Sequence, residues 1–181
     1  MESNKELKNK RIIFKLNTTK GLECFIDADF AGGFNQADSD NSNAIMSRTR
    51  FVIIFCGCPL ILCSKLQTKI TIFITEVEKI ALSQATREVL LMMALLKEIN
   101  SVFTLNMLTP DIYCKVYEDN ESCTSITKAQ HFSSRTKLIA TMYHHFRNHV
   151  KSGLLKNVSI DTKEQTADIF TKPLDKVYLF I

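Results

Sequence analysis

A short apolar stretch that ends in two aspartates constrains this chain more than any other feature. Residues 22–26 are apolar apart from one glutamate and rich in β-favouring side chains, as in a buried strand. Asp27 and Asp29 follow, before Gly32 and Gly33 interrupt the run. Residues i and i+2 of a strand share a face, so both carboxylates point the same way if the strand continues. Because like charges repel, the pattern indicates a cation between them, or alternatively an ordinary polar turn after a strand.

Composition limits the class of protein. With 181 residues, 45% of them hydrophobic and 23% charged, the chain is long enough for one compact globular domain. The net charge of +4 permits an acidic partner such as nucleic acid without arguing for one. No apolar run is long enough for a membrane span, residues 1–11 lack the apolar core of a signal peptide, and the six cysteines show no disulfide or zinc spacing. We therefore expect an intracellular protein, cytoplasmic or nuclear and not secreted, with reduced thiols.

The first half of the chain predicts an antiparallel meander followed by a long helix. Residues 1–20 look like a connector, and the domain is expected to occupy residues 21–181. Apolar strands are predicted at 22–26, 51–56 and 60–63, with Gly57 and Pro59 marking the second turn. From Thr75 to Asn100 the apolar residues recur at three- and four-residue steps, which predicts a helix with one apolar face. That face is predicted to comprise Ile80, Ala81, Ala85, Val89, Met92, Leu95, Leu96 and Ile99.

The second half predicts two further strands separated by helices. The expected elements are a strand in 111–119, a short helix near 120–122, a helix over 138–151, a strand at 154–160 and a final helical turn from Thr166. Strand–helix–strand crossovers force the later strands to pair in parallel. The sequence therefore predicts an α/β fold, with a five-stranded mixed sheet made of an antiparallel meander plus two parallel strands, flanked by helices.

Three more acids fall where strands end or helices begin. Glu78 lies in the first turn of the long helix, Asp119 ends the fourth strand, and Asp168 lies at the start of the last helix. Each has an ordinary explanation, because Thr75 and Glu78 form a capping box and acids suit helix N-termini. Capping does not explain the joint pattern, since the first and fourth strands would bring these acids and Asp27 to one edge if they are neighbours. Four carboxylates gathered there would require divalent metal.

Several motifs in the same order support one resemblance. They are Asp27-Ala28-Asp29-Phe30-Ala31-Gly32, Thr75-Glu76-Val77-Glu78, Glu118-Asp119-Asn120, Ser134-Arg135-Thr136-Lys137, Tyr143-His144-His145-Phe146-Arg147 and the segment from Glu164 to Leu174. With these motifs the chain resembles the ribonuclease H domain of copia-type LTR-retrotransposon polyproteins, from about Leu22 to Leu174. The resemblance implies a ribonuclease H-like fold, and residues 1–20 could then be the stump of a preceding reverse transcriptase.

The resemblance also implies an activity and its residues. The family's catalytic and metal-binding set carries over to Asp27, Glu78, Asp119 and Asp168. These acids would hold two Mg²⁺ ions, with Mn²⁺ as a substitute, and the enzyme would hydrolyse the RNA strand of an RNA–DNA hybrid. A reverse transcriptase encoded elsewhere is an expected partner, and neither a membrane nor a small-molecule cofactor is expected.

Basic residues suggest a surface for the nucleic acid. Arg135 and Lys137 lie in a matched motif, and Lys65 and Lys172 complete the predicted phosphate-binding set, although such residues also decorate any soluble domain. His145 and His149 stand one helical turn apart, and we interpret them as surface or packing histidines rather than a zinc site.

Two departures from the family leave other functions open. Lys79 follows the proposed ligand Glu78 where the family has an aromatic residue, and residues 133–140 lack two histidines and an aspartate of the family pattern. The alternatives to a nuclease are therefore a catalytically weak or inactive nucleic-acid-binding remnant, or a domesticated protein-interaction domain.

Overall fold

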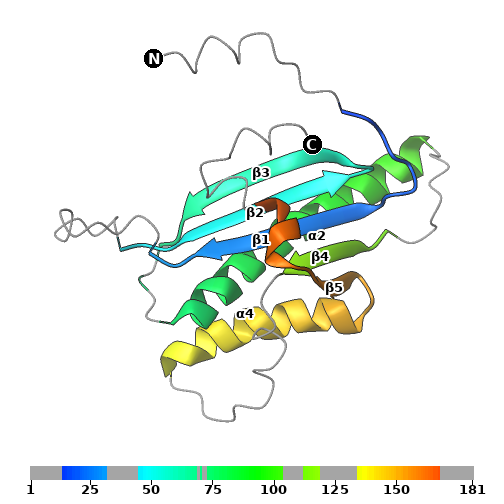
Figure 1. Ribbon diagram of the computed structural model, residues 1–181. Coiled ribbons are helices and arrows are strands. Elements are labelled where there is room, and N and C mark those ends of the chain that lie inside the picture. Colours follow the sequence, from blue (N-terminus) through cyan, green and yellow to red (C-terminus); the bar gives the residue numbers. More distant parts are fainter. Residues whose placement is uncertain are drawn as a thin grey trace, which may run out of the picture.

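The computed structural model describes residues 14–31, 45–68, 70, 73–103, 112–118 and 134–167. Within these ranges a sheet packs against two long helices (Figure 1). The elements in chain order are β1 (Leu22–Asp29), β2 (Arg48–Phe55), β3 (Cys58–Leu66), α2 (Ile74–Phe103), β4 (Cys114–Glu118), α4 (Ser134–Lys151), β5 (Leu155–Ser159) and the 3₁₀ helix η4 (Thr162–Glu164).

The sheet has the topology predicted from the sequence. Its strand order is β3-β2-β1-β4-β5, so β1 is the central strand. Strands β1, β2 and β3 form the antiparallel meander, while β4 pairs in parallel with both β1 and β5. The helix-containing crossovers between β3 and β4 and between β4 and β5 correspond to those parallel additions. The prediction of a five-stranded mixed sheet is confirmed, and β1 lies beside β4 as the clustering of acids requires.

The turn between β2 and β3 is tighter than predicted. It consists of Cys56 and Gly57, which both have positive φ, 51° and 79°, as in the two-residue turns that match strand twist. Pro59 was expected to mark the turn, but it lies within β3, and that expectation was wrong. A proline is tolerated there because β3 is an edge strand and because the register with β2 shifts between Ile53 and Ile54.

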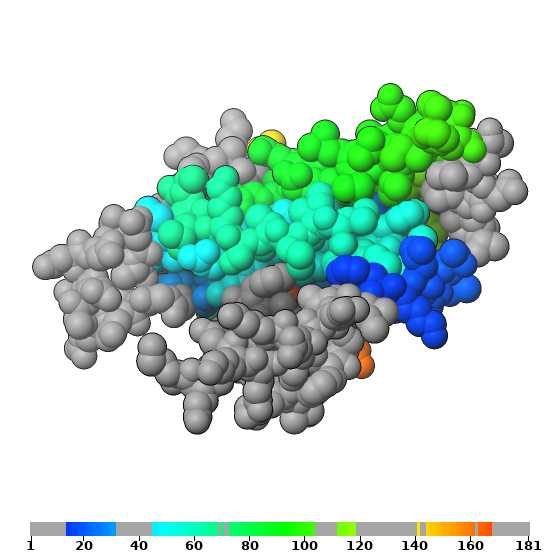
Figure 2. Space-filling model, turned by 90° about the horizontal axis from the view of Figure 1, so that it is seen from above, coloured from blue at the N-terminus to red at the C-terminus, as the bar shows by residue number. Residues whose placement is uncertain are grey.

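The hydrophobic core lies between the sheet and helix α2. Seen from above, α2 and the β2–β3 hairpin lie side by side (Figure 2). Alternate residues of β1 point towards the helix, among them Leu22, Cys24 and Ile26. The predicted apolar face of α2 is largely confirmed, but Met93 is buried where Met92 was expected, and Leu95 is 49% exposed. The helix therefore buries a slightly different stripe from the one that sequence spacing suggests.

Helix α2 begins one residue before the predicted cap. The Phe73 carbonyl accepts backbone hydrogen bonds from Glu76 (3.0 Å) and Val77 (3.4 Å), so Phe73 occupies the N-cap position. Thr75 is then inside the first turn, and the predicted capping box with Glu78 is wrong. Capping consequently does not account for Glu78, which lies in the second turn of the helix.

Three further predictions concern membrane spans, the cysteines and the outlying segments of the chain. No helix in the described ranges is long and apolar enough to cross a bilayer. The five cysteines that the structure describes are free thiols, in agreement with the expectation of reduced cysteines. The short helix predicted near residues 120–122 lies outside the described residues, as do most of the connector 1–20 and the final turn after Ala167.

Candidate active site at the end of strand β1

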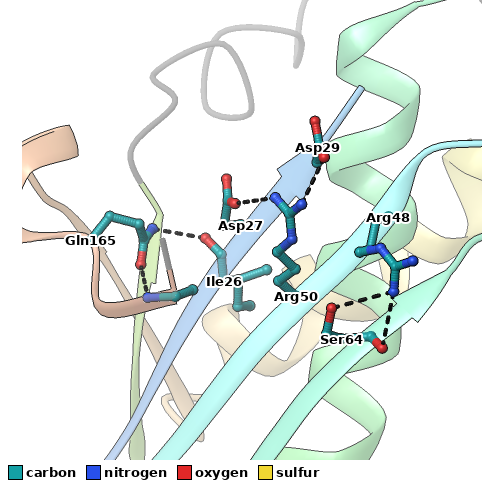
Figure 3. A network of polar contacts seen from close by, with 8 residues as sticks. Ile26, Asp27, Asp29, Arg48, Arg50, Ser64 and Gln165 are labelled. Atoms are coloured by element: carbon teal, nitrogen blue, oxygen red, sulfur yellow. Dashed lines mark hydrogen bonds and ion pairs between the residues drawn. The ribbon is translucent and has the colours of Figure 1, made fainter. Parts of the chain in front are cut away.

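Asp27 and Asp29 point to the same side of β1, as predicted, and a cation lies between them. That cation is the guanidinium of Arg50 in the neighbouring strand β2 (Figure 3). Arg50 Nη1 donates to Asp27 Oδ2 at 3.3 Å, and Nη2 donates to Asp29 Oδ2 at 2.6 Å. One arginine therefore joins both carboxylates, and the repulsion that the pattern implies is offset within the chain itself.

The register of the sheet explains this contact. Asp27 is the direct antiparallel partner of Arg50, so the two side chains leave the sheet on the same face. The Arg50 side chain is only 7% exposed, compared with 16% for Asp27 and 29% for Asp29. A buried guanidinium requires an anionic partner to offset its lost hydration, and the two aspartates supply it.

The backbone beside Asp27 is held by a residue from the far end of the chain. Gln165 is buried, and its Nε2 donates a 2.8 Å hydrogen bond to the carbonyl of Ile26, next to Asp27 (Figure 3). The Oε1 of Gln165 accepts a 3.3 Å hydrogen bond from the backbone of Ala167, which is fully buried. The segment after β5 is thereby fixed against the end of β1.

Glu78 is presented by the start of α2, which a second buried glutamine anchors. Gln67, just after β3, is 1% exposed, and its Nε2 donates to Thr49 Oγ1 at 3.1 Å and to the Val77 carbonyl at 2.9 Å. Val77 immediately precedes Glu78, so this contact fixes the helix backbone at the proposed ligand. Glu78 itself is half-buried, and so is the neighbouring Lys79.

The structure describes only part of the proposed metal cluster. Asp27 projects from the face of β1 opposite to the one that Ile26 presents to α2, whereas Glu78 is a half-buried residue of α2. Asp119 and Asp168 lie outside the described residues. Within the described ranges, no group of three or more histidine, cysteine or acidic side chains is placed to hold a metal. The four-carboxylate cluster therefore stays a prediction.

The described residues next to the two remaining acids in the chain belong to segments that contact β1. Asp119 directly follows Glu118, the last residue of β4, and β4 runs parallel to β1 with Phe25 opposite Tyr117. Asp168 directly follows Ala167, whose segment Gln165 binds to β1.

The same face of β1 carries an aromatic and acidic pair further from the end of the strand. Tyr117 of β4 stacks on Phe25, with ring centroids 4.5 Å apart, and its hydroxyl donates a 3.0 Å hydrogen bond to Glu23 Oε1. Burial and the neighbouring carboxylate of Glu23 raise the pKa of Tyr117 to about 12, because both disfavour the phenolate. Through these two contacts Tyr117 of β4 packs against Phe25 and Glu23 of β1 on one face of the sheet.

The predicted nucleic-acid-binding residues are only partly described. Lys65 is exposed in β3, on the sheet face opposite to Asp27, because it pairs with the inward-facing Thr49. Arg135 and Lys137 lie in the first turn of α4, and Lys172 lies outside the described residues. Their joint action on phosphate stays a prediction.

The two helix histidines contact each other on the surface of α4. His145 and His149 have their Nε2 atoms 3.3 Å apart, with ring centroids separated by 4.6 Å. Burial, together with the neighbouring His145, lowers the pKa of His149 below its ordinary value. His145 is exposed and His149 is half-buried, so the pair lies at the surface of the helix.

Three functional residues were missed from the sequence: Arg50, Gln67 and Gln165. Arg50 directly precedes the apolar run of residues 51–55, so its place in the second strand could be read from the sequence, but its pairing with Asp27 depends on the register between β1 and β2. The two glutamines had no such signal, because their partners are backbone carbonyls far away in sequence.

The strand order and pairing directions define the fold class: this is an α/β domain with a ribonuclease H-like mixed sheet. Among solved structures, the chain is similar to the N-terminal ribonuclease H domain of a Mycobacterium tuberculosis protein fused to maltose-binding protein, with 9% identity, a TM-score of 0.49, and 82% of this chain and 88% of that chain covered. It is also similar to the LC11 ribonuclease H1 in complex with an RNA/DNA hybrid, with 14% identity, a TM-score of 0.44, and 82% and 91% of the two chains covered. No family model matches the chain.

The sequence relatives of the chain are polyproteins of transposons. The chain is 33% identical over 168 residues to the retrovirus-related Pol polyprotein from transposon RE1 of Arabidopsis thaliana, covering 93% of this chain and 10% of that protein. It is 32% identical over 151 residues to the corresponding polyprotein from transposon TNT 1-94 of Nicotiana tabacum, covering 83% and 10%. The relatives that the chain matches are thus retrovirus-related Pol polyproteins from transposons, which confirms the resemblance found in its motifs. It spans about a tenth of the length of the curated relatives it matches.

Proposed function

We propose that this domain is a metal-dependent endonuclease that hydrolyses the RNA strand of RNA–DNA hybrids. The observation that carries the proposal is the relationship to Pol polyproteins over nearly the whole chain, together with an acid at every position of the motif set. The described part of the site agrees with it, because Asp27 stands near the end of the central strand and Glu78 near the start of the helix packed on that strand.

The proposed ligands have the chemistry that magnesium prefers. Asp27, Glu78, Asp119 and Asp168 offer only carboxylate oxygens, which are hard donors suited to Mg²⁺ or Mn²⁺. When bound, a pair of such ions supplies an activated water and stabilises the leaving oxygen of the phosphodiester. The fit is qualified by one contact, since Asp27 already has a cationic partner in Arg50.

The residues around the acids have a positioning role. Gln165 holds the backbone next to Asp27, and Gln67 holds the helix backbone next to Glu78. Both glutamines are buried, so each contact holds the backbone next to a proposed ligand in place. On the substrate side, Arg135, Lys137, Lys65 and Lys172 are proposed to contact phosphates, while the hybrid is distinguished by its shape and its 2′-hydroxyl groups rather than by sequence.

Cleavage of a labelled hybrid tests this function. The purified chain is incubated with an RNA–DNA hybrid, and with DNA–DNA duplex of the same sequence, with magnesium, with manganese or with EDTA. We expect metal-dependent cleavage of the RNA strand alone, reduced to background by Glu78→Gln. Glu98→Gln serves as the matched control, because it makes the same change on an exposed position of α2 and should retain cleavage. No cleavage by the wild type under any metal condition would reject the nuclease.

A second candidate is a nucleic-acid-binding remnant without activity. The pairing of Asp27 with Arg50 favours it, because a bound guanidinium lowers the negative charge that attracts metal. Binding of an uncleaved hybrid in EDTA, weakened by higher salt, together with the absence of cleavage would support this candidate.

A further inference from the structure

We infer that Arg50 is a built-in counter-cation that occupies the cation position at Asp27, so that divalent metal binds this domain only in competition with it. The inference rests on the proposed function, since it concerns the same site. It assigns a property to this chain that the number of carboxylates alone would not suggest: weak metal affinity caused by one named side chain.

The guanidinium of Arg50 contacts two carboxylates at once. The two terminal nitrogens of Arg50 are used on two different carboxylates, at 3.3 Å to Asp27 and 2.6 Å to Asp29. The guanidinium therefore lies between Asp27 and Asp29 (Figure 3). The sequence pattern left either a cation or a polar turn open at this point, and the structure has a cationic side chain of the same sheet there.

Arg50 is buried and has little freedom to bind anything other than the two aspartates. Its side chain is 7% exposed, and among the described residues its Nε finds no hydrogen-bond partner. A guanidinium so buried, with both terminal nitrogens already bound, is not available to a substrate phosphate at the surface. Arg48, two residues earlier on the same face, shows the contrast: its Nη1 lies 3.5 Å from both the carbonyl and the hydroxyl of Ser64 and contacts neither aspartate (Figure 3).

Arg50 and a divalent metal ion would compete for the carboxylate of Asp27. A magnesium ion binds carboxylate oxygen at about 2.0–2.1 Å, and the Oδ2 of Asp27 is the oxygen that Arg50 contacts. An ion there would face a guanidinium of like charge in a partly buried setting, where screening by water is reduced. A metal ion can therefore bind Asp27 only if Arg50 moves away, or with an affinity that the repulsion from Arg50 lowers.

Calorimetric titration of the full chain with magnesium chloride or manganese chloride alone tests the inference. Arg50→Gln should bind metal about tenfold more tightly than the wild type, or more, because a neighbouring charge changes the affinity of a carboxylate for a cation by that order. Arg48→Gln is the matched control. It removes the same charge from the same face of the same strand without touching Asp27, and should change affinity by less than about threefold. Equal affinity in the wild type and Arg50→Gln would overturn the inference.

A second variant guards against loss of folding. Arg50→Gln leaves two carboxylates facing each other, so the double variant Arg50→Gln with Asp29→Asn removes that repulsion, keeps Asp27 and has the net charge of the wild type. Thermal unfolding in EDTA establishes which variants are folded. If only the double variant folds, tighter metal binding by it supports the inference, and unchanged affinity overturns it.

Cleavage assays separate this inference from the nuclease proposal. Tighter metal binding by Arg50→Gln, with no hybrid cleavage by either protein, would support the counter-cation role and reject the nuclease. Hybrid cleavage by the wild type, with the same metal affinity in both proteins, would support the nuclease and reject the counter-cation role. Absence of metal binding in every folded variant would reject both.

Discussion

Gln165 donates a hydrogen bond of 2.8 Å to the backbone carbonyl of Ile26, a residue 139 positions earlier in the chain. The contact joins the segment that follows the last strand to the central strand, next to Asp27. Gln165 is buried, so its side-chain amide binds the Ile26 carbonyl in place of water. Removing the Gln165 side chain would leave that carbonyl without this donor. The geometry of the candidate site thus depends on a residue that is itself chemically inert.

The Gln165 contact makes a stability prediction. Gln165→Met keeps the volume but removes both hydrogen bonds, and should lower the free energy of unfolding by about 1–3 kcal/mol. Lys163→Ala, in the same segment but exposed, should change it by less than about 0.5 kcal/mol. Urea unfolding followed by circular dichroism measures both, and equal effects of the two changes would contradict a specific role for Gln165.

Gln67 should behave in the same way at the start of α2. Its side chain is almost fully buried and donates to Thr49 and to the Val77 carbonyl, so Gln67→Met should cost about 1–3 kcal/mol. The exposed neighbour Thr68 provides the control, as Thr68→Ala should be nearly neutral. Amide hydrogen exchange in the first turn of α2 should accelerate only in the Gln67 variant. An unchanged exchange rate there would show that Gln67 does not anchor the helix.

The raised pKa of Tyr117 predicts a loss of folding stability at high pH. Its pKa is raised to about 12 in the folded chain from an ordinary value of 10.0, so its contribution is fully present below pH 10 and is lost as the pH rises towards 12. Tyr117→Phe removes the hydrogen bond to Glu23 and should cost about 1–2 kcal/mol at neutral pH. The difference between the two proteins should shrink above about pH 10. Chemical unfolding at several pH values checks this, and a constant difference would refute the assignment.

For His149 we expect folding stability to be lost as the pH falls into the mildly acidic range, the opposite of the direction expected for Tyr117. Its folded pKa lies below the ordinary value of 6.5, so the unfolded chain binds the proton first as the pH falls. Its contribution is therefore present above pH 6.5 and is lost below it. His145→Asn removes the neighbouring charge, one of the two causes, and should raise the pKa of His149 as measured by NMR titration. A pKa of His149 that does not respond to this change would exclude the histidine pair as a cause.

The sequence by itself determined the arrangement of the sheet. Apolar runs of strand length, a long stretch of helical period and the lengths of the connections settle element type and pairing direction, because each depends on local pattern and on chain reach. The common face of Asp27 and Asp29 also follows from alternation along a strand, and the order of the motifs predicted the resemblance to Pol polyproteins that the sequence relatives bear out.

Only the tertiary structure decided what those two aspartates contact. The pairing with Arg50 depends on the register between β1 and β2, which hydrophobic patterning fixes only to within a shift of two residues. The anchors at Gln67 and Gln165 depend on long-range packing, since each amide binds a backbone carbonyl, and every residue supplies the same carbonyl. A sequence shows which side chains are present, but a contact to backbone or a choice among equivalent registers is selected by the packing of the whole domain.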